Sequence, residues 1–302
     1  MNIEQLNADY GIANKVQFVE GKGGFPIIKV NNEYAQAVIS VYAGQVLSFQ
    51  PVDQAEDIMF FSSKAYHQEG KAMKGGAPIC WPWFGPDPED KGRSSHGFVR
   101  NRLCQMREVV STQDGATKVT LGLTDTAETR AIWDYGFDFA IAITVGKSLT
   151  VKLITRNTGD KTFSITQALH TYFKVGNIKQ VQVLGLAGND YIDKVDSGKQ
   201  KTQSGEVAFD RECDRIYLNV QPELTINDGA LERQIKITAT NSKTAIVWNP
   251  WATISANMAD LEDHDYQNFV CVETANAADE VIEVAAGSEY KLTANYAVTK
   301  SA

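Results

Sequence analysis

The segment FDFAIAITVGKSLTVKL, residues 137–153, decides the fold class of this 302-residue chain. Apolar residues alternate with polar or small ones on both sides of the Gly146-Lys147-Ser148 turn. A period of two places the apolar set on one face of a β-strand, and a short polar turn between two such runs is typical of a β-hairpin. The segment therefore predicts two antiparallel strands that cover a core with one face.

The same alternation recurs outside the hairpin, for example in QIKITA at 234–239. Turn chemistry separates the alternating runs, at Gly23-Gly24, Asp114-Gly115, 157–160, 227–229 and Asn241-Ser242. No internal repeat or linker interrupts the chain. We therefore expect an all-β protein, a large antiparallel β-sandwich formed by one domain over residues 1–302. The one helical expectation is a short turn at 256–261.

The segment KAMKGGAPICWPWFGPDPEDKGRSSHGFVRNR, residues 71–102, breaks this pattern. It contains four of the eight prolines and two of the five tryptophans of the chain. Such a stretch cannot form one regular strand, so we expect a long ordered loop. Long loops in compact domains usually carry function.

Composition and charge exclude several classes of protein. Hydrophobic residues make up 43% and charged residues 22% of the chain, which is typical of a globular protein. The net charge of -8 argues against a nucleic-acid partner, which would need clustered cations. We see no secretory leader and no apolar run of membrane length, so we expect a cytoplasmic protein without a membrane partner. The four cysteines form no CxxC pair and are expected to be buried free thiols.

The candidates for chemistry are few, because the chain has four histidines. His67 and His264 lie in polar stretches and are expected to be incidental surface residues. His96 lies in the long loop, and His170 lies on an alternating strand where it shares a face with Ala168 and Tyr172. Either histidine could be a structural residue or a functional one on local sequence alone.

Glu273 stands out among the acidic residues because it follows the apolar run FVCV at 269–272. A carboxylate on a buried strand is either paired structurally or has a raised pKa that suits proton transfer. The sequence has no metal-ligand spacing such as HExxH, no GxSxG elbow and no phosphate-binding glycine loop. We therefore expect no metal and no cofactor.

Six motifs occur together in one order: KGGAPICWPWFG at 74–85, HGFVRN at 96–101, ALHTYF at 168–173, DYIDKV at 190–195, VWNPW at 247–251 and CVET at 271–274. In this order the chain resembles the hexose-6-phosphate mutarotases of the aldose 1-epimerase superfamily. The resemblance extends from about Phe25 to Tyr296. It implies a galactose-mutarotase-like β-sandwich and an isomerase that interconverts the α and β anomers of a hexose 6-phosphate. Glucose 6-phosphate is the hexose 6-phosphate that we expect as its main substrate.

The resemblance also implies roles for particular residues. His170 matches the general acid of the family and Glu273 the general base. Lys74 and Arg100 match its phosphate ligands. Many members have arginine where this chain has Lys74, and lysine lacks the planar fork that binds phosphate through two hydrogen bonds.

Three more residues are implied to contact the sugar itself. Trp83 matches a residue that lines the sugar site, Asp193 one that binds sugar hydroxyls, and His96 lies in the same loop as the phosphate ligands. Trp81 and Trp248 are further candidates for an aromatic wall. The expected partner is a small sugar phosphate, bound by a monomer.

Three alternatives stay open at this point. A plain aldose 1-epimerase would act on free hexoses. A glycoside hydrolase or lyase on a similar sandwich would need two carboxylates, which Glu273 and Asp193 could supply. A non-catalytic sugar-phosphate sensor would keep the fold without the chemistry.

Overall fold

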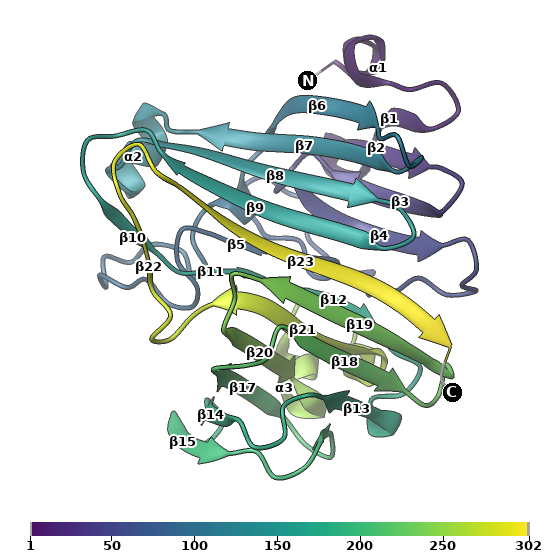
Figure 1. Cartoon of the computed structure of the whole chain (residues 1–302), viewed down its shortest axis with the longest axis vertical. Coiled ribbons are helices and arrows are strands. Elements are labelled where there is room, and N and C mark those ends of the chain that lie inside the picture. The colour runs from purple at the N-terminus through teal and green to yellow at the C-terminus, as the bar shows by residue number, and fades with distance from the viewer. Residues whose placement is uncertain (1, 301–302) are drawn as a thin grey trace.

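The computed structural model describes residues 2–300. Its largest element is a long antiparallel sheet that runs through both halves of the molecule (Figure 1). This sheet has nine strands. In spatial order they are β16 (Val207–Ala208), β13 (Val181–Leu184), β18 (Glu223–Asp228), β19 (Arg233–Thr240), β23 (Glu289–Lys300), β9 (Leu149–Asn157), β8 (Phe137–Val145), β7 (Thr117–Thr124) and β6 (Gln105–Ser111). The long strand β23 joins the two halves of the molecule, because it pairs with β9 on one side and β19 on the other.

A second sheet, of eight strands, carries the residues of most interest. Its strands are β15 (Lys199–Thr202), β14 (Asp190–Asp193), β17 (Cys213–Leu218), β20 (Thr244–Asn249), β21 (Phe269–Asn276), β11 (Gln167–Leu169) and β5 (Ile79–Cys80), with β12 (Tyr172–Lys174) also paired to β21. Two smaller sheets complete the described strands: β1 (Val16–Glu20), β2 (Pro26–Asn31), β3 (Ala35–Ser40) and β4 (Gln45–Pro51), and the pair β10 (Phe163–Ile165) and β22 (Ile282–Val284).

The hairpin expected at 137–153 is confirmed as β8 and β9, which pair from Phe137–Asn157 to Val145–Leu149. The inward side chains of β8, at 137, 139, 141, 143 and 145, are all 0% exposed. Burying each of them contributes about 1.5–3 kcal/mol, which offsets the entropy lost when the strand becomes ordered. The expected antiparallel β-sandwich and the long loop at 71–102, which contains only β5 and a 3-10 turn at Val99–Asn101, are likewise confirmed.

The helices were poorly predicted. The expected turn at 256–261 is wrong in its bounds, because helix α3 spans Trp251–Asn257 and starts directly after Pro250. Helices α1 (Ile3–Tyr10) and α2 (Ala127–Ile132) were not expected at all. Both are short and depend on N-terminal caps, Asn2 for α1 and the Thr126–Thr129 capping box for α2. No helix of residues 2–300 is long and apolar enough to cross a membrane.

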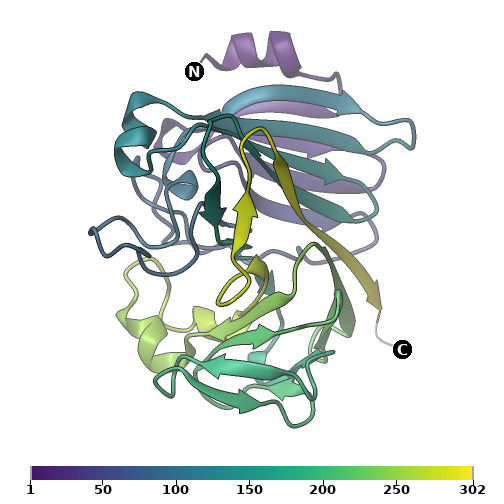
Figure 2. The same cartoon turned by 60° about the vertical axis from the view of Figure 1, so that its left-hand side comes forward.

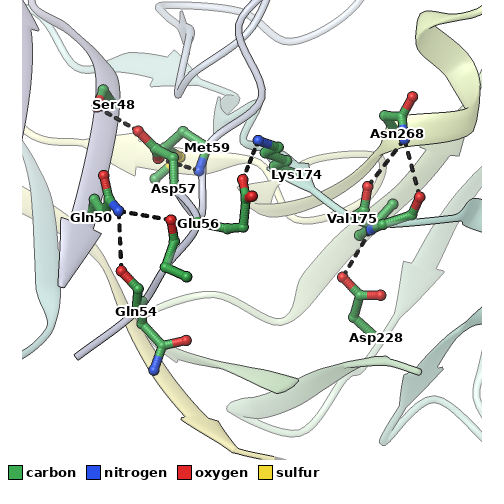
Figure 3. Close-up of polar contacts among 12 residues, drawn as sticks. Ser48, Gln50, Gln54, Glu56, Asp57, Met59, Lys174, Val175, Asp228 and Asn268 are labelled. Carbon is green, nitrogen blue, oxygen red and sulfur yellow. Dashed lines mark hydrogen bonds and ion pairs between the residues drawn. The ribbon is translucent and has the colours of Figure 1, made fainter. Parts of the chain in front are cut away.

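A network of polar contacts holds the segment after β4 against β12 (Figure 3). The Asp57 carboxylate accepts hydrogen bonds from Ser48 and from the backbone N–H of Met59, and Lys174 forms an ion pair with Glu56. Arg233, only 3% exposed, donates to the backbone carbonyls of Glu56, Asp57 and Lys174. These contacts fix the position of β12, which begins two residues after His170.

Candidate active site

The side chains of His170 and Glu273 lie side by side on one face of the eight-stranded sheet. Glu273 is inside β21, whose eight residues are all buried. His170 lies in the break between β11 and β12, and both of those strands pair with β21. The register places Leu169 opposite Thr274 and Tyr172 opposite Cys271, so the two side chains meet, with His170 Nδ1 3.4 Å from Glu273 Oε1.

Burial leaves this pair with unsatisfied polar atoms. The side chain of Glu273 is 1% exposed and that of His170 is 14% exposed. Both carboxylate oxygens of Glu273 and Nδ1 of His170 are buried without a hydrogen-bond partner among residues 2–300. Such groups are costly for a fold, so their retention marks a candidate site of function.

The pKa values of the pair are shifted in opposite directions. Burial raises the pKa of Glu273 well above 4.5, and the nearby Asp214 carboxylate raises it further. Burial also lowers the pKa of His170 well below 6.5, with smaller contributions from the charges of His96, Arg100 and Lys74. Both shifts favour the neutral forms, so the pair can hold one proton and exchange it over a short distance.

Two cations reach the same region from the long loop. Arg100 donates through Nη2 to the Ser95 carbonyl at 3.0 Å, while its Nε is buried without a partner. Among the described residues Arg100 forms no ion pair with a carboxylate. The Lys74 ammonium lies 3.5 Å from the Asp260 carboxylate, and their side chains are 18% and 17% exposed. The site therefore contains one unpaired guanidinium that can bind an anion.

Glycines next to these cations let the loop approach the sheet closely. Gly76 has φ +64, and a Cβ there would lie 2.1 Å from the Val46 carbonyl oxygen. Gly97 has φ +70, and a Cβ there would lie 1.9 Å from the Trp81 carbonyl oxygen. The glycines of KGG and HGF therefore permit backbone contacts that bring Lys74 and Arg100 to the site.

His96 is held in one tautomer by the loop. Its backbone has a left-handed φ of 64°, and its backbone N–H donates to the Gly85 carbonyl. The ring Nδ1 accepts a hydrogen bond from the Gly85 backbone N–H at 3.2 Å. Burial lowers the pKa of His96 to about 3, with Arg100 and Lys74 adding to the effect. The neutral ring then carries its proton on Nε2, which is free to donate a hydrogen bond. The ring centroids of His96 and His170 are 5.9 Å apart.

Aromatic rings surround His170 on the sheet face. Tyr172 stacks on it with ring centroids 5.1 Å apart, and Trp248 meets it edge-on at 5.9 Å. Trp248 is half-buried, so part of its surface is free to contact the apolar face of a sugar. Trp81, in contrast, is a core residue with 0% exposure.

The structure does not bring Trp83 to this group. Its ring is 4% exposed, its indole N–H donates to the Ser94 carbonyl, and the Arg93 guanidinium covers it at 4.4 Å. The next residue, Phe84, takes the position nearer the site, with its ring 5.0 Å from that of His96.

Asp193 also lies away from the group. It pairs in register with Arg215, one position from Asp214, and adjacent residues of a strand point to opposite faces. Its carboxylate accepts from the backbone N–H of Val195 and forms an ion pair with Lys201 at 2.8 Å. These contacts give Asp193 a structural role in the turn that follows β14.

Asp214 is a candidate that the sequence analysis missed. It pairs in register with Trp248, and Trp248 with Cys271, so Asp214 lies on the same sheet face as Glu273. Burial raises its pKa to about 6, partly offset by Lys194. The stretch around Asp214 carries many charges, and only the pairing of β17 with β20 singles this residue out.

A groove of the described surface lies elsewhere, between the segment after α1 and the four-stranded sheet of β1 to β4. It has a volume of about 830 Å³ and is lined by residues of 7–17, 29–31, 36–38 and 48–50. No histidine or carboxylate lines it. The chemistry therefore favours the His170–Glu273 region over this groove as the candidate active site.

Removing the buried carboxylate should stabilise the protein. We expect Glu273→Gln to unfold at a higher temperature than wild type at pH 8, with a smaller difference at pH 5. The native state retains a proton on Glu273 that the unfolded state releases, so wild-type stability falls as pH rises above about 5. The slope is at most about 1.4 kcal/mol per pH unit.

Thermal unfolding of both proteins across this pH range measures the effect. The shift of His170 acts in both proteins and largely cancels in the comparison. Equal melting temperatures for the two proteins at every pH would show that Glu273 is ionised without penalty in the native state.

Comparisons with known proteins agree with the expectations of fold and activity. A family model described as aldose 1-epimerase matches residues 26–297. A protein of Escherichia coli K12 named "Putative glucose-6-phosphate 1-epimerase" is 36% identical over 254 residues, which are 84% of this chain and 84% of that protein. A protein of Cenchrus ciliaris with the same name is 35% identical and covers 84% of this chain and 79% of its own length.

A solved structure gives the same result in three dimensions. The crystal structure of a "putative mutarotase (YeaD)" from Salmonella typhimurium superimposes with a TM-score of 0.90 at 31% identity. The match covers 96% of each chain. The whole architecture, with both large sheets, is therefore shared.

Proposed function

The chain belongs to the aldose 1-epimerase family. From this premise we propose that it interconverts the α and β anomers of D-hexose 6-phosphates, with glucose 6-phosphate as the main substrate. The enzyme is thus an isomerase of the 1-epimerase type. Two relatives that are 35–36% identical to this chain over the aligned residues have names that specify glucose 6-phosphate. The proposal extends that substrate to this chain.

One observation supports the proposal most strongly. His170 and Glu273 form a buried pair at 3.4 Å, with pKa values shifted toward each other's range, beside an unpaired guanidinium. A pair of this kind can give a proton to one oxygen and take one from another without net change of charge. Anomer exchange of a sugar needs these two proton transfers and no change of oxidation state.

The proposed mechanism uses the pair as acid and base. In the complex with substrate, the one proton of the pair passes from Glu273 to His170. The Glu273 carboxylate then takes the proton from the anomeric hydroxyl while the His170 imidazolium protonates the ring oxygen, and the bond between C1 and the ring oxygen breaks. Rotation about C1–C2 presents the other face of the open-chain aldehyde. On ring closure the roles reverse and the starting protonation state returns. Each group contributes about 10²- to 10⁴-fold to the rate.

The neighbouring residues position the substrate in this proposal. Arg100 and Lys74 bind the phosphate, His96 donates from Nε2 to a sugar oxygen, and Asp214 accepts from a hydroxyl. Trp248 covers the apolar face of the ring. The protein is proposed to act in the cytoplasm, because a phosphorylated sugar carries charge that keeps it inside the cell, and to act as a monomer.

Phosphorylated substrates should be preferred over free ones. We expect kcat/KM for glucose 6-phosphate to exceed that for glucose or galactose at least tenfold at low salt, because two charge-assisted contacts contribute about 1.5–3 kcal/mol each. The preference should weaken as salt rises, since the cations are partly exposed. Steady-state rates with the three sugars at two salt concentrations measure it.

Two alternatives make different predictions in the same experiment. Equal values for phosphorylated and free sugars would contradict phosphate recognition and leave a plain aldose 1-epimerase. Binding of glucose 6-phosphate without anomer exchange above background would favour a sensor. The hydrolase alternative loses Asp193, which lies on the opposite face of the sheet from Glu273, and would need Asp214 as its second carboxylate.

A further inference from the structure

Lys74 already has an anionic partner in the structure. Its ammonium lies 3.5 Å from the Asp260 carboxylate, and both side chains are more than four-fifths buried. No hydrogen bond to the Asp260 carboxylate is found among residues 2–300. The charge of Asp260 therefore depends on Lys74 for its compensation, whereas the guanidinium of Arg100 is unpaired.

The position of Asp260 is fixed by the turn that carries it. The next residue, Leu261, is 0% exposed and packs with Phe60 and Tyr172 in a core cluster. The following Glu262 forms an ion pair with Lys64, and Asp265 accepts from the Ser62 hydroxyl. Figure 2 shows this turn, after α3, on the same side of the molecule as the long loop. Asp260 is thus anchored, while Lys74 has a long, flexible side chain.

We propose that Asp260 is a resident competitor for the phosphate group, which sets the affinity for phosphorylated substrates by holding Lys74 until phosphate displaces it. This inference rests on the proposed function, in which Lys74 and Arg100 bind phosphate. A free sugar leaves the Lys74–Asp260 pair intact. A sugar phosphate must draw the single charge of Lys74 away and then lies near the uncompensated Asp260 carboxylate.

The charges at the site explain why this residue controls affinity. Lysine offers one compact charge, so it cannot bind Asp260 and phosphate with full strength at the same time. A partly buried ion pair is weakened by salt, so competition by Asp260 is strongest at low ionic strength. Asp260 therefore acts on substrate binding and not on the proton transfers at His170 and Glu273.

The test is Asp260→Asn, which keeps the shape of the side chain and removes its charge. We expect KM for glucose 6-phosphate to fall about threefold or more at low salt, with kcat little changed, and the inhibition constant of inorganic phosphate to fall in parallel. The matched control is Asp263→Asn, an exposed residue of the same turn that changes net charge equally and should leave KM unaltered. In the double variant with Lys74→Met the effect of Asp260→Asn should disappear.

The outcomes separate this inference from the proposal beneath it. A KM for glucose 6-phosphate that stays constant or rises in Asp260→Asn would overturn the inference and show that Asp260 only positions Lys74. An equal fall in Asp263→Asn would overturn it too, because the effect would then follow net charge. If wild type shows no preference for glucose 6-phosphate and no inhibition by phosphate, phosphate recognition itself is wrong.

Discussion

Replacing His170 by Asn or Glu273 by Gln should each reduce the rate of anomer exchange at least ~10²-fold. Glu273→Gln keeps the size of the side chain, His170→Asn keeps a polar one, and each removes the ability to exchange a proton. The two groups lie 3.4 Å apart and are buried, so water cannot easily replace either of them. The measurement is kcat for glucose 6-phosphate in each variant.

The double variant should be little slower than either single one, because residues that act as a unit are not additive. The matched control is His264→Asn, an exposed histidine in the turn before β21, which should leave the rate unchanged. Thermal unfolding of each variant separates lost chemistry from lost structure. A single variant that keeps near-wild-type exchange with an intact fold would remove that residue from the mechanism.

Replacing Arg100 by Met should raise KM for glucose 6-phosphate by about 10- to 100-fold, which corresponds to one charge-assisted contact of 1.5–3 kcal/mol. Arg100 has no carboxylate partner among residues 2–300, so no resident anion reduces its contribution. Methionine retains the apolar stem that packs against the loop. The measurement is KM and kcat for glucose 6-phosphate and glucose.

The matched control for this prediction is Arg102→Met. Arg102 lies two residues away, forms an ion pair with Glu128 at 2.9 Å and covers the Phe98 ring, outside the His170 region. Its loss should leave KM for the sugar phosphate near the wild-type value. An equal loss with free glucose in Arg100→Met would show that Arg100 acts on the chemistry of the pair and not on phosphate.

The sheets could be predicted from the sequence because alternation depends on local order alone. The runs at 137–145 and 149–153 are strands with the expected inward faces, and the expected face of Ala168, His170 and Tyr172 is also found. Helices α1 and α2 were not predicted, because helices of eight and six residues are too short to show a clear helical period of apolar residues.

Only part of the candidate site could be predicted from the sequence. The motifs around His170, Glu273, Lys74 and Arg100 indicate one site, and the structure brings these side chains to one region. The face that a strand residue takes depends on strand register, and therefore Asp214 was missed while Asp193 was expected at the site. Trp83 lies in the long loop, where its contacts with Ser94 and Arg93 set its position and no periodic pattern predicts them. The partner of Lys74, Asp260, lies 186 positions along the chain, and no local pattern links the two.

Exchange NMR on glucose 6-phosphate tests the central claim most directly. The experiment follows magnetisation transfer between the α and β anomeric protons, with catalytic amounts of wild-type protein, with His170→Asn, and without protein. We predict exchange well above the enzyme-free rate with wild type, and a return close to that rate with His170→Asn. Exchange with wild type that equals the enzyme-free rate would contradict the account.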